Sequence, residues 1–484
     1  MNLQDPSLFK NQNYINGQWV DAASGQVFDV VNPANGEVVG QVADGSAADT
    51  KVAIEAAEKA LPAWRNKTAK ERANILRRWY DLMMENQEDL ATIMTIEQGK
   101  PLFETRGEVG YGASFVEWFA EEGKRTYGEV IPHVFNDRRQ VVIKQPIGVV
   151  GAITPWNFPN AMITRKAAPA LAAGCTFVVK PDAGTPYSAL ALAELATRAG
   201  IPEGVFNIVC GSDSAAIGEE LTSNRTVRKI TFTGSTRVGK ILLRQSAETV
   251  KRVSMELGGN APVLVFDDAD LDKAVAGALG SRYRNAGQTC VCANRIYVQE
   301  SIHDAFVEKF TAAVAAMKLG NGMEKGVTMG PLIHEQAVER VDGMVQDALQ
   351  KGATATTGGK RSDLGSCFYE PTVLTNVDKS MRVFQEEIFG PVAPIFTFKT
   401  EEEAIELAND TEYGLAAYFY SRDIGRCWRV AEGVDFGMVG VNEVAITSEM
   451  MPFGGVKDSG MGREGSHMGI DEYLEVKYIC MGGL

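Results

Sequence analysis

The pattern of apolar and polar residues changes near residue 147. Upstream, residues 50–65 and 70–99 are rich in Ala, Leu and Glu and repeat their apolar positions at helical spacing, which predicts helices. Residues 129–147 instead alternate in polarity and contain many β-branched side chains, which predicts a hairpin that turns at Asn136–Asp137. We therefore expect a mainly helical first third that ends in an antiparallel β segment.

Downstream, short apolar runs alternate with helical stretches. Between residues 147 and 260 the strand-like runs are GVVGAITP, CTFVVKP, VFNIVCG and KITFTG, and they are followed by predicted helices at 161–173, 187–199, 214–221 and 236–246. Residues 261–450 repeat the pattern with PVLVF, NRIYVQ, PTVLTN and APIFTF. Apolar strands that alternate with helices are typical of buried parallel sheets. The predicted fold class is α/β, with two doubly wound parallel-sheet lobes and a β appendage that includes the alternating C-terminal run DEYLEVKYICM.

Composition narrows the function classes. The chain has 484 residues, of which 45% are hydrophobic and 23% charged, and this length predicts about three domains. Its net charge of −14 disfavours a nucleic-acid partner, because such proteins carry a basic surface. The longest relevant uncharged run, Ala167–Val179, is shorter than a membrane span. The N-terminus lacks an apolar signal segment and the seven cysteines are scattered, so we expect reduced thiols, a cytoplasmic location and no membrane partner.

A glycine-containing loop, FTGSTRVGK, follows a predicted strand and opens a predicted helix. Gly234 and Gly239 would let backbone N–H groups approach a phosphate at the helix N-terminus. The spacing also matches most of a P-loop, but Ile241 stands where that motif needs the Ser or Thr that holds magnesium. Nucleoside triphosphate hydrolysis is therefore disfavoured, and a phosphate-binding loop and a simple tight turn remain.

Cys290 is the candidate nucleophile. A lone cysteine is more often an inert buried side chain, but Cys290 lies in the polar, glycine-containing stretch RNAGQTCVCANR. Asn157 in TPWNFP and Glu256 in SMELGGNAP supply groups that suit one chemistry. A thiolate attacks an aldehyde, an amide stabilises the oxyanion, a nicotinamide takes the hydride, and a carboxylate activates water to hydrolyse the thioester. No histidine lies in a catalytic-looking motif and no spacing suits zinc, so we predict no metal.

Seven motifs occur together in one order: TPWNFP, VVKP, FTGSTRVG, MELGGNAP, GQTC, EEIFGPV and PFGGVKDSG. With them, the chain resembles the NAD(P)-dependent aldehyde dehydrogenase superfamily over essentially its whole length. The resemblance implies Cys290 as nucleophile, Glu256 as general base and Asn157 as oxyanion donor. The presence of Glu256 also points to hydrolysis rather than transfer of the acyl group to coenzyme A. The implied cofactor-binding residues are Thr154, Trp156, Lys180, Ala183, Gly234, Ser235, Leu257, Glu387 and Phe389.

The resemblance also implies a domain organisation. Residues 1–128 and 148–257 would form a Rossmann-like cofactor-binding domain, and residues 258–455 a catalytic domain. Residues 129–147 and 456–484 would form an arm that pairs subunits into a homodimer or homotetramer. Among the cofactor residues, Glu387 has an alternative interpretation, because clusters such as QEE are usually solvated helix faces.

Ala183 bears on the choice of cofactor. In NAD-preferring relatives the residue three positions after the motif lysine is often Glu, which binds the ribose hydroxyls and repels a 2′-phosphate. Here Ala183 follows Lys180 at that distance, so NADP is expected to be preferred while NAD remains possible. The nearby Asp182 works against this expectation if its carboxylate faces the phosphate.

Two arginines near the catalytic motifs bear on the substrate. Arg165 and Arg284 suit carboxylate binding, although each alone could be an ordinary ion-paired residue. Together with Ser448, which precedes PFGG, they resemble the succinate-semialdehyde dehydrogenase subfamily, which implies a semialdehyde substrate from 4-aminobutyrate breakdown. Glutarate semialdehyde, one methylene longer, and a broader aldehyde range stay open.

Two further alternatives remain. Cys292 is either a small filler beside the nucleophile or a resolving thiol that traps Cys290 as a disulfide under oxidation. The whole chain could also be a non-catalytic structural protein with the same fold. The presence of Cys290, Glu256 and Asn157 favours an enzyme.

Overall fold

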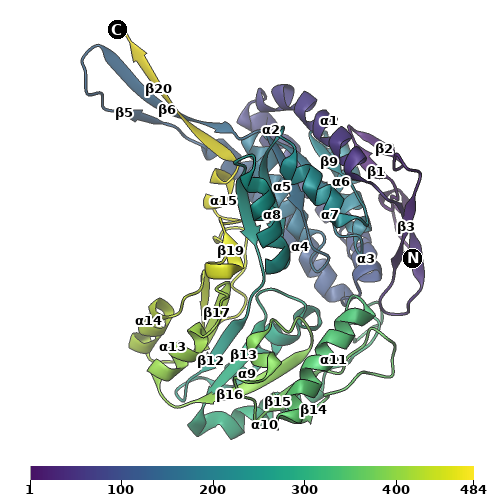
Figure 1. Cartoon of the computed structure of the whole chain (residues 1–484), viewed down its shortest axis with the longest axis vertical. Helices are drawn as coiled ribbons and strands as arrows, with labels where there is room; N and C mark the ends of the chain where they lie inside the picture. Colours follow the sequence, from purple (N-terminus) through teal and green to yellow (C-terminus); the bar gives the residue numbers. More distant parts are fainter. Residues whose placement is uncertain (1, 484) are drawn as a thin grey trace.

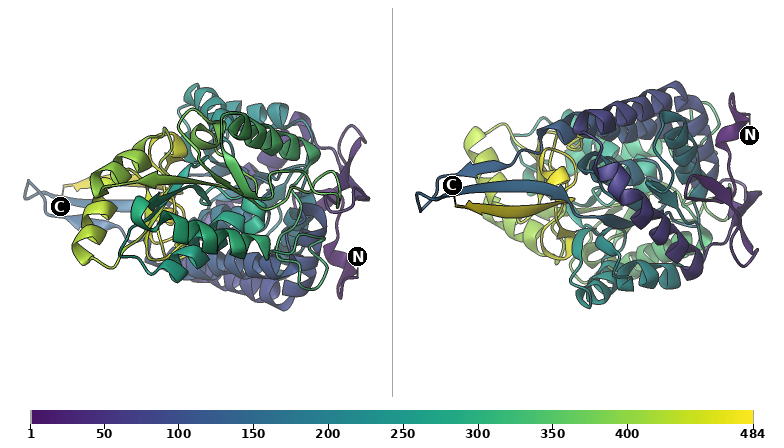
Figure 2. Two further views of the ribbon diagram at one scale, coloured as in Figure 1. Left: turned by 90° about the horizontal axis from the view of Figure 1, so that it is seen from below. Right: turned by 90° about the horizontal axis from the view of Figure 1, so that it is seen from above.

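The computed structural model describes residues 2–483, which form two lobes stacked one above the other and a narrow arm that projects from one end (Figure 1). Each lobe is built on a sheet with a parallel core, which confirms the predicted α/β class with two parallel-sheet lobes. The views from below and above in Figure 2 show the arm extending well clear of both lobes. No helix within residues 2–483 is both long enough and apolar enough to cross a membrane.

The first lobe contains an eight-stranded sheet in the order β19-β11-β10-β7-β8-β9-β1-β2. Its five central strands are parallel, and the edges are closed by antiparallel partners. The strands are β1 (Asn13–Ile15), β2 (Gln18–Val20), β7 (Val149–Ile153), β8 (Thr176–Lys180), β9 (Phe206–Ile208), β10 (Val227–Thr233), β11 (Arg252–Glu256) and β19 (Gly460–Met461). A separate ribbon pairs β3 (Val27–Val31) with β4 (Val38–Ala43).

Helices cover both faces of this sheet because its strands are apolar on both sides. Val149 and Val178 pack with one group of helices, whereas Val150 and Val179 belong to the core on the opposite face. Helix α5 is buried along its whole length and ends at Gly174, whose left-handed φ of 99° suits a residue without a side chain. The helices are α1 (Ala47–Arg65), α2 (Ala69–Glu85), α3 (Gln87–Gln98), α4 (Leu102–Glu122), α5 (Ala161–Ala173), α6 (Pro186–Ala199), α7 (Ser214–Ser223) and α8 (Thr236–Ala247).

The second lobe contains a seven-stranded sheet in the order β14-β15-β16-β13-β12-β17-β18, parallel except for β14. Its strands are β12 (Ala261–Val265), β13 (Ala293–Gln299), β14 (Thr354–Thr357), β15 (Thr372–Thr375), β16 (Val392–Phe398), β17 (Ala416–Tyr420) and β18 (Met438–Val441). Its helices are α9 (Leu271–Tyr283), α10 (His303–Ala315), α11 (Glu335–Gln350), α12 (Arg382–Gln385), α13 (Glu401–Asn409) and α14 (Ile424–Gly433).

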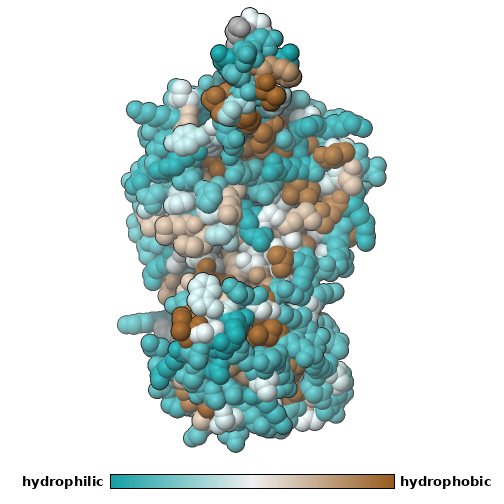
Figure 3. All heavy atoms as spheres, turned by 90° about the vertical axis from the view of Figure 1, so that its left-hand side faces the viewer, coloured by the Kyte–Doolittle hydropathy of each residue, from teal (hydrophilic) through white to brown (hydrophobic). Residues whose placement is uncertain are grey.

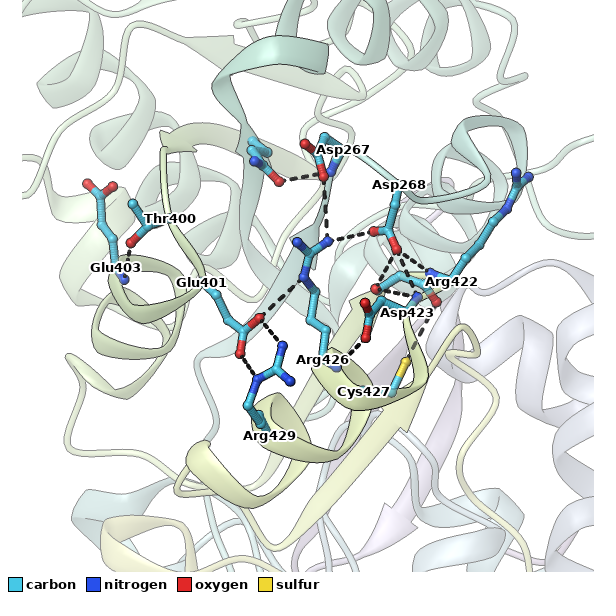
Figure 4. A network of polar contacts seen from close by, with 12 residues as sticks. Asp267, Asp268, Thr400, Glu401, Glu403, Arg422, Asp423, Arg426, Cys427 and Arg429 are labelled. Atoms are coloured by element: carbon cyan, nitrogen blue, oxygen red, sulfur yellow. Dashed lines mark hydrogen bonds and ion pairs between the residues drawn. The ribbon is translucent and has the colours of Figure 1, made fainter.

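An ion-pair network holds helices α13 and α14 against the carboxyl end of β12 (Figure 4). The Arg426 guanidinium lies 2.8 Å from Asp268 and 3.3 Å from Glu401, and Arg429 lies 2.6 Å from the same glutamate. The hydroxyl of residue 421 and the backbone N–H groups of residues 422 and 423 also donate to the Asp268 carboxylate. The network stabilises the end of the second sheet at which its parallel strands finish.

The arm is a three-stranded antiparallel sheet in the order β20-β6-β5. It combines the predicted hairpin, β5 (Glu129–Ile131) and β6 (Arg138–Pro146), with the C-terminal strand β20 (Leu474–Gly482). The strand β19 and the short helix α15 (Met468–Asp471) precede β20, and β19 pairs with β11 in the first lobe. Strand pairing therefore places only part of residues 456–484 in the arm sheet. The predicted division of the chain into a cofactor-binding domain, a catalytic domain and an arm stays a prediction.

One predicted helix is interrupted. The segment 70–99 forms two helices, α2 and α3, because Asn86 donates its side-chain amide to the Leu82 carbonyl and leaves helical geometry. Side chains that bond to nearby backbone groups compete with helix propagation, so an Asn within a periodic stretch can end a helix that the apolar spacing would continue.

Candidate active site

A cavity of about 420 Å³ lies between the two lobes. Its walls come from the loops that follow β7, β10 and β11 in the first sheet and from the loops that precede β13 and β16 in the second. The carboxyl ends of one parallel sheet therefore face the amino ends of the other across this space. In the first sheet β8 and β9 extend from one side of β7, and the chain then returns to place β10 on the other side of β7. The loops after β7 and β10 therefore diverge. Such a switch point is where open α/β sheets bind ligands.

Cys290 lines this cavity from the turn before β13 and is partly exposed. Burial of its surroundings raises the pKa of the thiol to about 12, the Glu387 carboxylate adds to the increase, and Arg165 opposes it. The sulfur is therefore a thiol at neutral pH, and it becomes a nucleophile only when its proton is removed.

Glu256 ends strand β11 beneath the cavity and is 2% exposed. Neither of its carboxylate oxygens has a hydrogen-bond partner in the described part of the chain, and the side chain is not among the lining residues. Burial, reinforced by the nearby charge of Glu464, raises its pKa well above the usual range, while Arg165 opposes the increase. A buried carboxyl with a raised pKa and no fixed contact accepts a proton more readily than an ordinary glutamate, as a general base must.

Asn157 lines the cavity from the loop between β7 and α5. Its side-chain amide donates one hydrogen to the carbonyl of Gln288, at 3.0 Å, two residues before Cys290. An amide nitrogen carries two hydrogens, so the second is left for an acceptor in the cavity. The arrangement fits a donor that is held in place before an oxyanion forms near the sulfur.

Six of the nine cofactor residues line the same cavity, and three do not. Those that line it are Trp156, Gly234, Ser235, Leu257, Glu387 and Phe389. Thr154 and Lys180 are buried at the carboxyl ends of β7 and β8, where the Thr154 backbone N–H bonds to the Lys180 carbonyl. The Lys180 ammonium donates to the Ser214 hydroxyl at 2.6 Å, and Ala183 lies in the half-buried loop that follows. Thr154, Lys180 and Ala183 thus lie at or just after strand ends on the same edge of the sheet, but outside the wall of the cavity.

Glu387 and Phe389 follow the helix α12 and do not lie on it. The Glu387 carboxylate accepts a bond from the Gly259 backbone N–H at 3.1 Å, and burial raises its pKa to about 7. The solvated-helix interpretation of Glu387 is therefore wrong. Phe389 has a left-handed φ of 51°, and its ring meets the Trp156 ring edge to face at 5.6 Å.

The local structure fits a dinucleotide better than a nucleoside triphosphate. Ser235 caps helix α8, and the Thr233 hydroxyl is buried at the cavity wall without a hydrogen-bond partner in the described residues. A Cβ on Gly234 would lie 2.4 Å from the Phe232 ring, so a side chain there would require that ring to move. Lys240 pairs with Asp458 at 2.5 Å, which gives the lysine of the P-loop alternative a protein partner.

The two candidate substrate arginines differ in environment. Arg284 is exposed at the cavity, lies 5.1 Å from the Phe158 ring, and has no ion pair or side-chain hydrogen bond in the described residues. Arg165 is 2% exposed and lies 2.6 Å from the Glu464 carboxylate. Ser448 does not line this cavity. It lines a neighbouring one of about 220 Å³ that shares Thr447 and Phe453 with the first.

Several lining residues were missed from the sequence. Tyr111 comes from α4, Met162 from α5, and Arg340 from α11, where its guanidinium donates to the carbonyls of Glu387 and Ile388. None of these three residues lies in one of the seven motifs. The helices that carry Tyr111 and Arg340 reach the cavity only through tertiary packing, which the local sequence does not indicate. Arg237 lies inside the loop motif and could have been found as an exposed cation at a helix start.

Cys292 is buried and does not line the cavity. Its sulfur contacts the Arg282 guanidinium at 3.0 Å and donates toward the Gly287 carbonyl at 3.4 Å. A disulfide with Cys290 would require these contacts to break, and the redox hypothesis stays a prediction.

The chain is similar to known proteins over its whole length. The model of the aldehyde dehydrogenase family matches residues 19–479. A glutarate-semialdehyde dehydrogenase of Pseudomonas aeruginosa is 62% identical over 484 residues, with 100% of each chain covered. An NADP(+) succinate-semialdehyde dehydrogenase of Escherichia coli is 60% identical over 482 residues, again with 100% of each chain covered. The crystal structure of an Escherichia coli NADP-dependent enzyme superposes with a TM-score of 0.98 at 60% identity, covering 99% of this chain and 100% of that one.

Proposed function

The chain belongs to the aldehyde dehydrogenase family, and from this premise we propose that it oxidises a short semialdehyde with a distal carboxylate to the corresponding dicarboxylate. As a family member it is an oxidoreductase that acts on aldehydes. Succinate semialdehyde is the expected substrate and glutarate semialdehyde the second candidate, since similar proteins carry both names. The two differ by one methylene, which typically changes discrimination by only about 1–3 kcal/mol.

The observation that carries this proposal is the free guanidinium of Arg284 in the cavity that holds Cys290. A cation that has no ion pair within residues 2–483 and lines the same cavity as the Cys290 thiol suits a substrate with an aldehyde at one end and an anion at the other. Arg165 also lines the cavity, but its guanidinium already has an ion-pair partner in Glu464, which it shares with Lys166. We therefore assign the carboxylate primarily to Arg284, with Arg165 and the more distant Ser448 shaping the pocket.

The proposed chemistry uses three side chains. The Cys290 thiol gives its proton to the Glu256 carboxylate, which passes it to solvent, and the resulting thiolate adds to the aldehyde carbon. The aldehyde oxygen becomes an oxyanion to which the free N–H of the Asn157 amide donates. Bound NAD(P) supplies the hydride acceptor that turns the thiohemiacetal into a thioester. Glu256 takes a proton from the water that attacks the thioester, so the acid is released and the Cys290 sulfur is regenerated.

Glu256 needs mobility for this role. Its carboxylate is buried beneath the lining, and no hydrogen bond from the described residues holds either oxygen. A rotation of the side chain toward the cavity would bring it to the sulfur and the attacking water. A carboxylate at this position supports a free acid as the product.

The residues around Lys180 support NADP as the preferred cofactor, with NAD accepted. Lys180 is a cation at the end of β8, and Ala183 places no acid where a 2′-phosphate would be repelled. Asp182 turns its carboxylate toward its own loop, where it accepts from the Gly184 backbone N–H at 2.8 Å. The similar Escherichia coli enzyme is NADP-dependent by name.

The arm supports assembly with a second copy of the chain into a homodimer or homotetramer. Apolar side chains gather on the arm at the top of the molecule (Figure 3). Val130 and Val134 are each more than 80% exposed, and Val476 is 69% exposed. Exposed apolar surface of this kind is typical of a protein–protein contact. We retain residues 129–147 and 456–484 as the proposed oligomerisation arm, beside a cofactor-binding and a catalytic domain.

A panel of aldehydes with both cofactors tests the proposal. Succinate and glutarate semialdehydes are compared with butanal and pentanal, which lack the carboxylate, by following absorbance at 340 nm. We expect kcat/KM to be at least about 10-fold higher for the semialdehydes, because a bond to a charged group contributes about 1.5–3 kcal/mol. Equal values for charged and uncharged aldehydes would overturn the carboxylate assignment. No turnover with any aldehyde would favour the non-catalytic alternative.

A further inference from the structure

A buried chain of hydrogen bonds lies behind the Asn157 amide. The Lys100 backbone N–H donates to the Gln98 side-chain carbonyl at 3.0 Å, and the Gln98 amide donates to the Asn285 side-chain oxygen at 3.0 Å. The Asn285 amide in turn donates to the Asn157 backbone carbonyl at 3.0 Å and to the Gln288 carbonyl at 3.4 Å. Gln98, Lys100 and Asn285 are each at most 1% exposed, so water does not compete for these bonds.

The orientation of the Asn285 amide follows from its neighbours. Because Gln98 donates to its oxygen, its nitrogen must face the two carbonyls of Asn157 and Gln288. A flipped amide would set three oxygens against one another. Asn285 itself has a left-handed φ of 50°, a conformation that Asn adopts more readily than most residues.

Asn285 therefore contacts both residues of the hydrogen bond that holds the Asn157 amide, the proposed oxyanion donor, in place. The Gln288 carbonyl that it contacts is the one that accepts the Asn157 side-chain amide at 3.0 Å. Asn157 belongs to the loop after β7, whereas Gln288 belongs to the loop that carries Cys290. One side chain thus sets the position of the amide donor relative to the nucleophile across the two lobes.

Lys100 holds the same backbone carbonyl of Asn157. Its ammonium donates to this oxygen at 2.6 Å and to Glu108 at 2.5 Å, and it lies 4.1 Å from the Phe158 ring. The other oxygen of Glu108 accepts from the backbone N–H groups of residues 160 and 161. The ion pair clamps both ends of the loop segment that carries Asn157. Such a buried pair is retained only where additional hydrogen bonds satisfy both charges, as they do here.

We propose that Asn285 is a positioning residue for oxyanion stabilisation, and that Lys100 supports it through the shared Asn157 carbonyl. The inference rests on the proposed role of Asn157. Neither Asn285 nor Lys100 lines the cavity, so neither contacts the substrate. Donors fixed in advance stabilise developing charge far more than mobile ones, and a displacement of about 1 Å can cost about 100-fold in rate. Loss of Asn285 should therefore affect the transition state more than substrate binding.

The variant Asn285→Asp tests this directly, because it keeps the shape but points an oxygen at the two carbonyls. We expect kcat to fall by about 10- to 100-fold while KM changes by less than about 3-fold. The same substitution is made in an Asn157→Ala background. If Asn285 acts through Asn157, the second substitution lowers kcat by less than about 2-fold there. A loss of equal size in both backgrounds, or a loss confined to KM, would overturn the proposal.

Asn207→Asp is the matched control. The Asn207 amide is fully buried in β9 and also donates to two backbone carbonyls, of Phe177 at 3.3 Å and Gly204 at 2.7 Å, but it does not line the cavity. It should lower Tm without lowering kcat of the folded enzyme. An equal loss of kcat in this variant would reduce Asn285 to a general structural role.

A second variant covers the case in which Asn285→Asp does not fold. Gln98→Leu removes the donor that orients the Asn285 amide and leaves both carbonyls intact. It should produce a smaller loss of kcat, which must again disappear in the Asn157→Ala background. All variants are assayed with whichever aldehyde the wild type oxidises best, because the oxyanion forms on any aldehyde. Failure of the semialdehyde assignment therefore leaves this test intact.

Discussion

The guanidinium of Arg165 and the carboxylate of Glu464 lie 2.6 Å apart and are 2% and 4% exposed. Glu464 also pairs with the buried ammonium of Lys166. The glutamate follows β19, and both cations lie on α5, so this cluster joins the C-terminal segment to the wall of the cavity. One carboxylate is thus shared by two buried cations beside the site, and the three groups together keep a net positive charge.

Glu464→Gln is expected to destabilise the protein strongly. Removing one partner of a buried ion pair leaves an uncompensated charge and typically costs about 3–5 kcal/mol of unfolding free energy. The thermal midpoint and the urea midpoint both measure the loss. Glu117→Gln is the matched control, since Glu117 pairs with Arg77 at 2.7 Å on the surface, where such pairs contribute about 0–1 kcal/mol. Similar losses for the two variants would contradict the importance of burial.

The contribution of Glu464 should also depend on pH. Burial acts to raise its pKa, but Lys166 and Arg165 outweigh burial and hold the pKa below the ordinary value. A carboxyl whose pKa is lowered by folding stabilises the protein above the pKa of the unfolded state and loses this effect as pH falls through the folded pKa. The difference in midpoint between wild type and Glu464→Gln should therefore shrink on acidification. A constant difference from pH 7 to pH 3 would contradict the ionised pair.

Arg284→Leu should impair the oxidation of semialdehydes selectively. This guanidinium makes no ion pair or side-chain hydrogen bond among the described residues, so its removal breaks no direct contact of that kind. It also removes a charge that lowers the pKa of the buried Glu104 carboxyl, so Tm is measured alongside activity. We expect KM for succinate semialdehyde to rise by about 10- to 100-fold, as for the loss of a hydrogen bond to a charged group. Steady-state kinetics with butanal provide the control, and its constants should change little. Equal losses with both aldehydes would remove Arg284 from substrate recognition.

Alkylation of Cys290 should accelerate with pH. Burial, then the Glu387 carboxylate, raises the pKa of the thiol to about 12, and only the thiolate reacts. The rate constant with iodoacetamide should rise about tenfold per pH unit from 7 to 9, without a plateau. Quantitative mass spectrometry of the Cys290 peptide separates this reaction from that of the other free cysteines. A plateau near pH 7 in the cofactor-free protein would show that the thiol is already ionised.

The pattern of the sequence predicts the parallel lobes and the arm hairpin, because these elements bury continuous apolar runs or alternate in polarity. Helix α5 has the predicted bounds 161–173, since every residue in it is buried and Gly174 ends it. The motifs predict Cys290, Asn157 and the cofactor residues as parts of one site, and the fold places Cys290, Asn157 and most of the cofactor residues at one cavity. Local sequence was sufficient to predict those site residues that lie at the ends of strands.

Tertiary pairing could not be predicted in this way. Arg165 and Arg284 have the same side chain, and only the fold shows that Glu464 forms an ion pair with the first and not with the second. The position of Ser448 beside a neighbouring cavity likewise depends on the path of residues 446–453. Asn285 lies between two motif residues, but its role depends on contacts with α3 and with the loop after β7. These features arise from segments that meet only in the folded chain.

Ala183→Glu tests the cofactor assignment at the end of β8. A carboxylate placed near Lys180 would repel a 2′-phosphate and could bind a free ribose diol, so NADPH should bind more weakly and NADH equally or better. Fluorescence titration of each reduced cofactor gives Kd without requiring turnover. Ala183→Gln is the matched control, because it adds the same bulk without the charge. If both variants weaken NADPH and NADH alike, bulk and not charge limits binding there. If neither changes the ratio of the two Kd values, residue 183 does not contact the 2′ position, and the preference must come from elsewhere around Lys180 and Ser214.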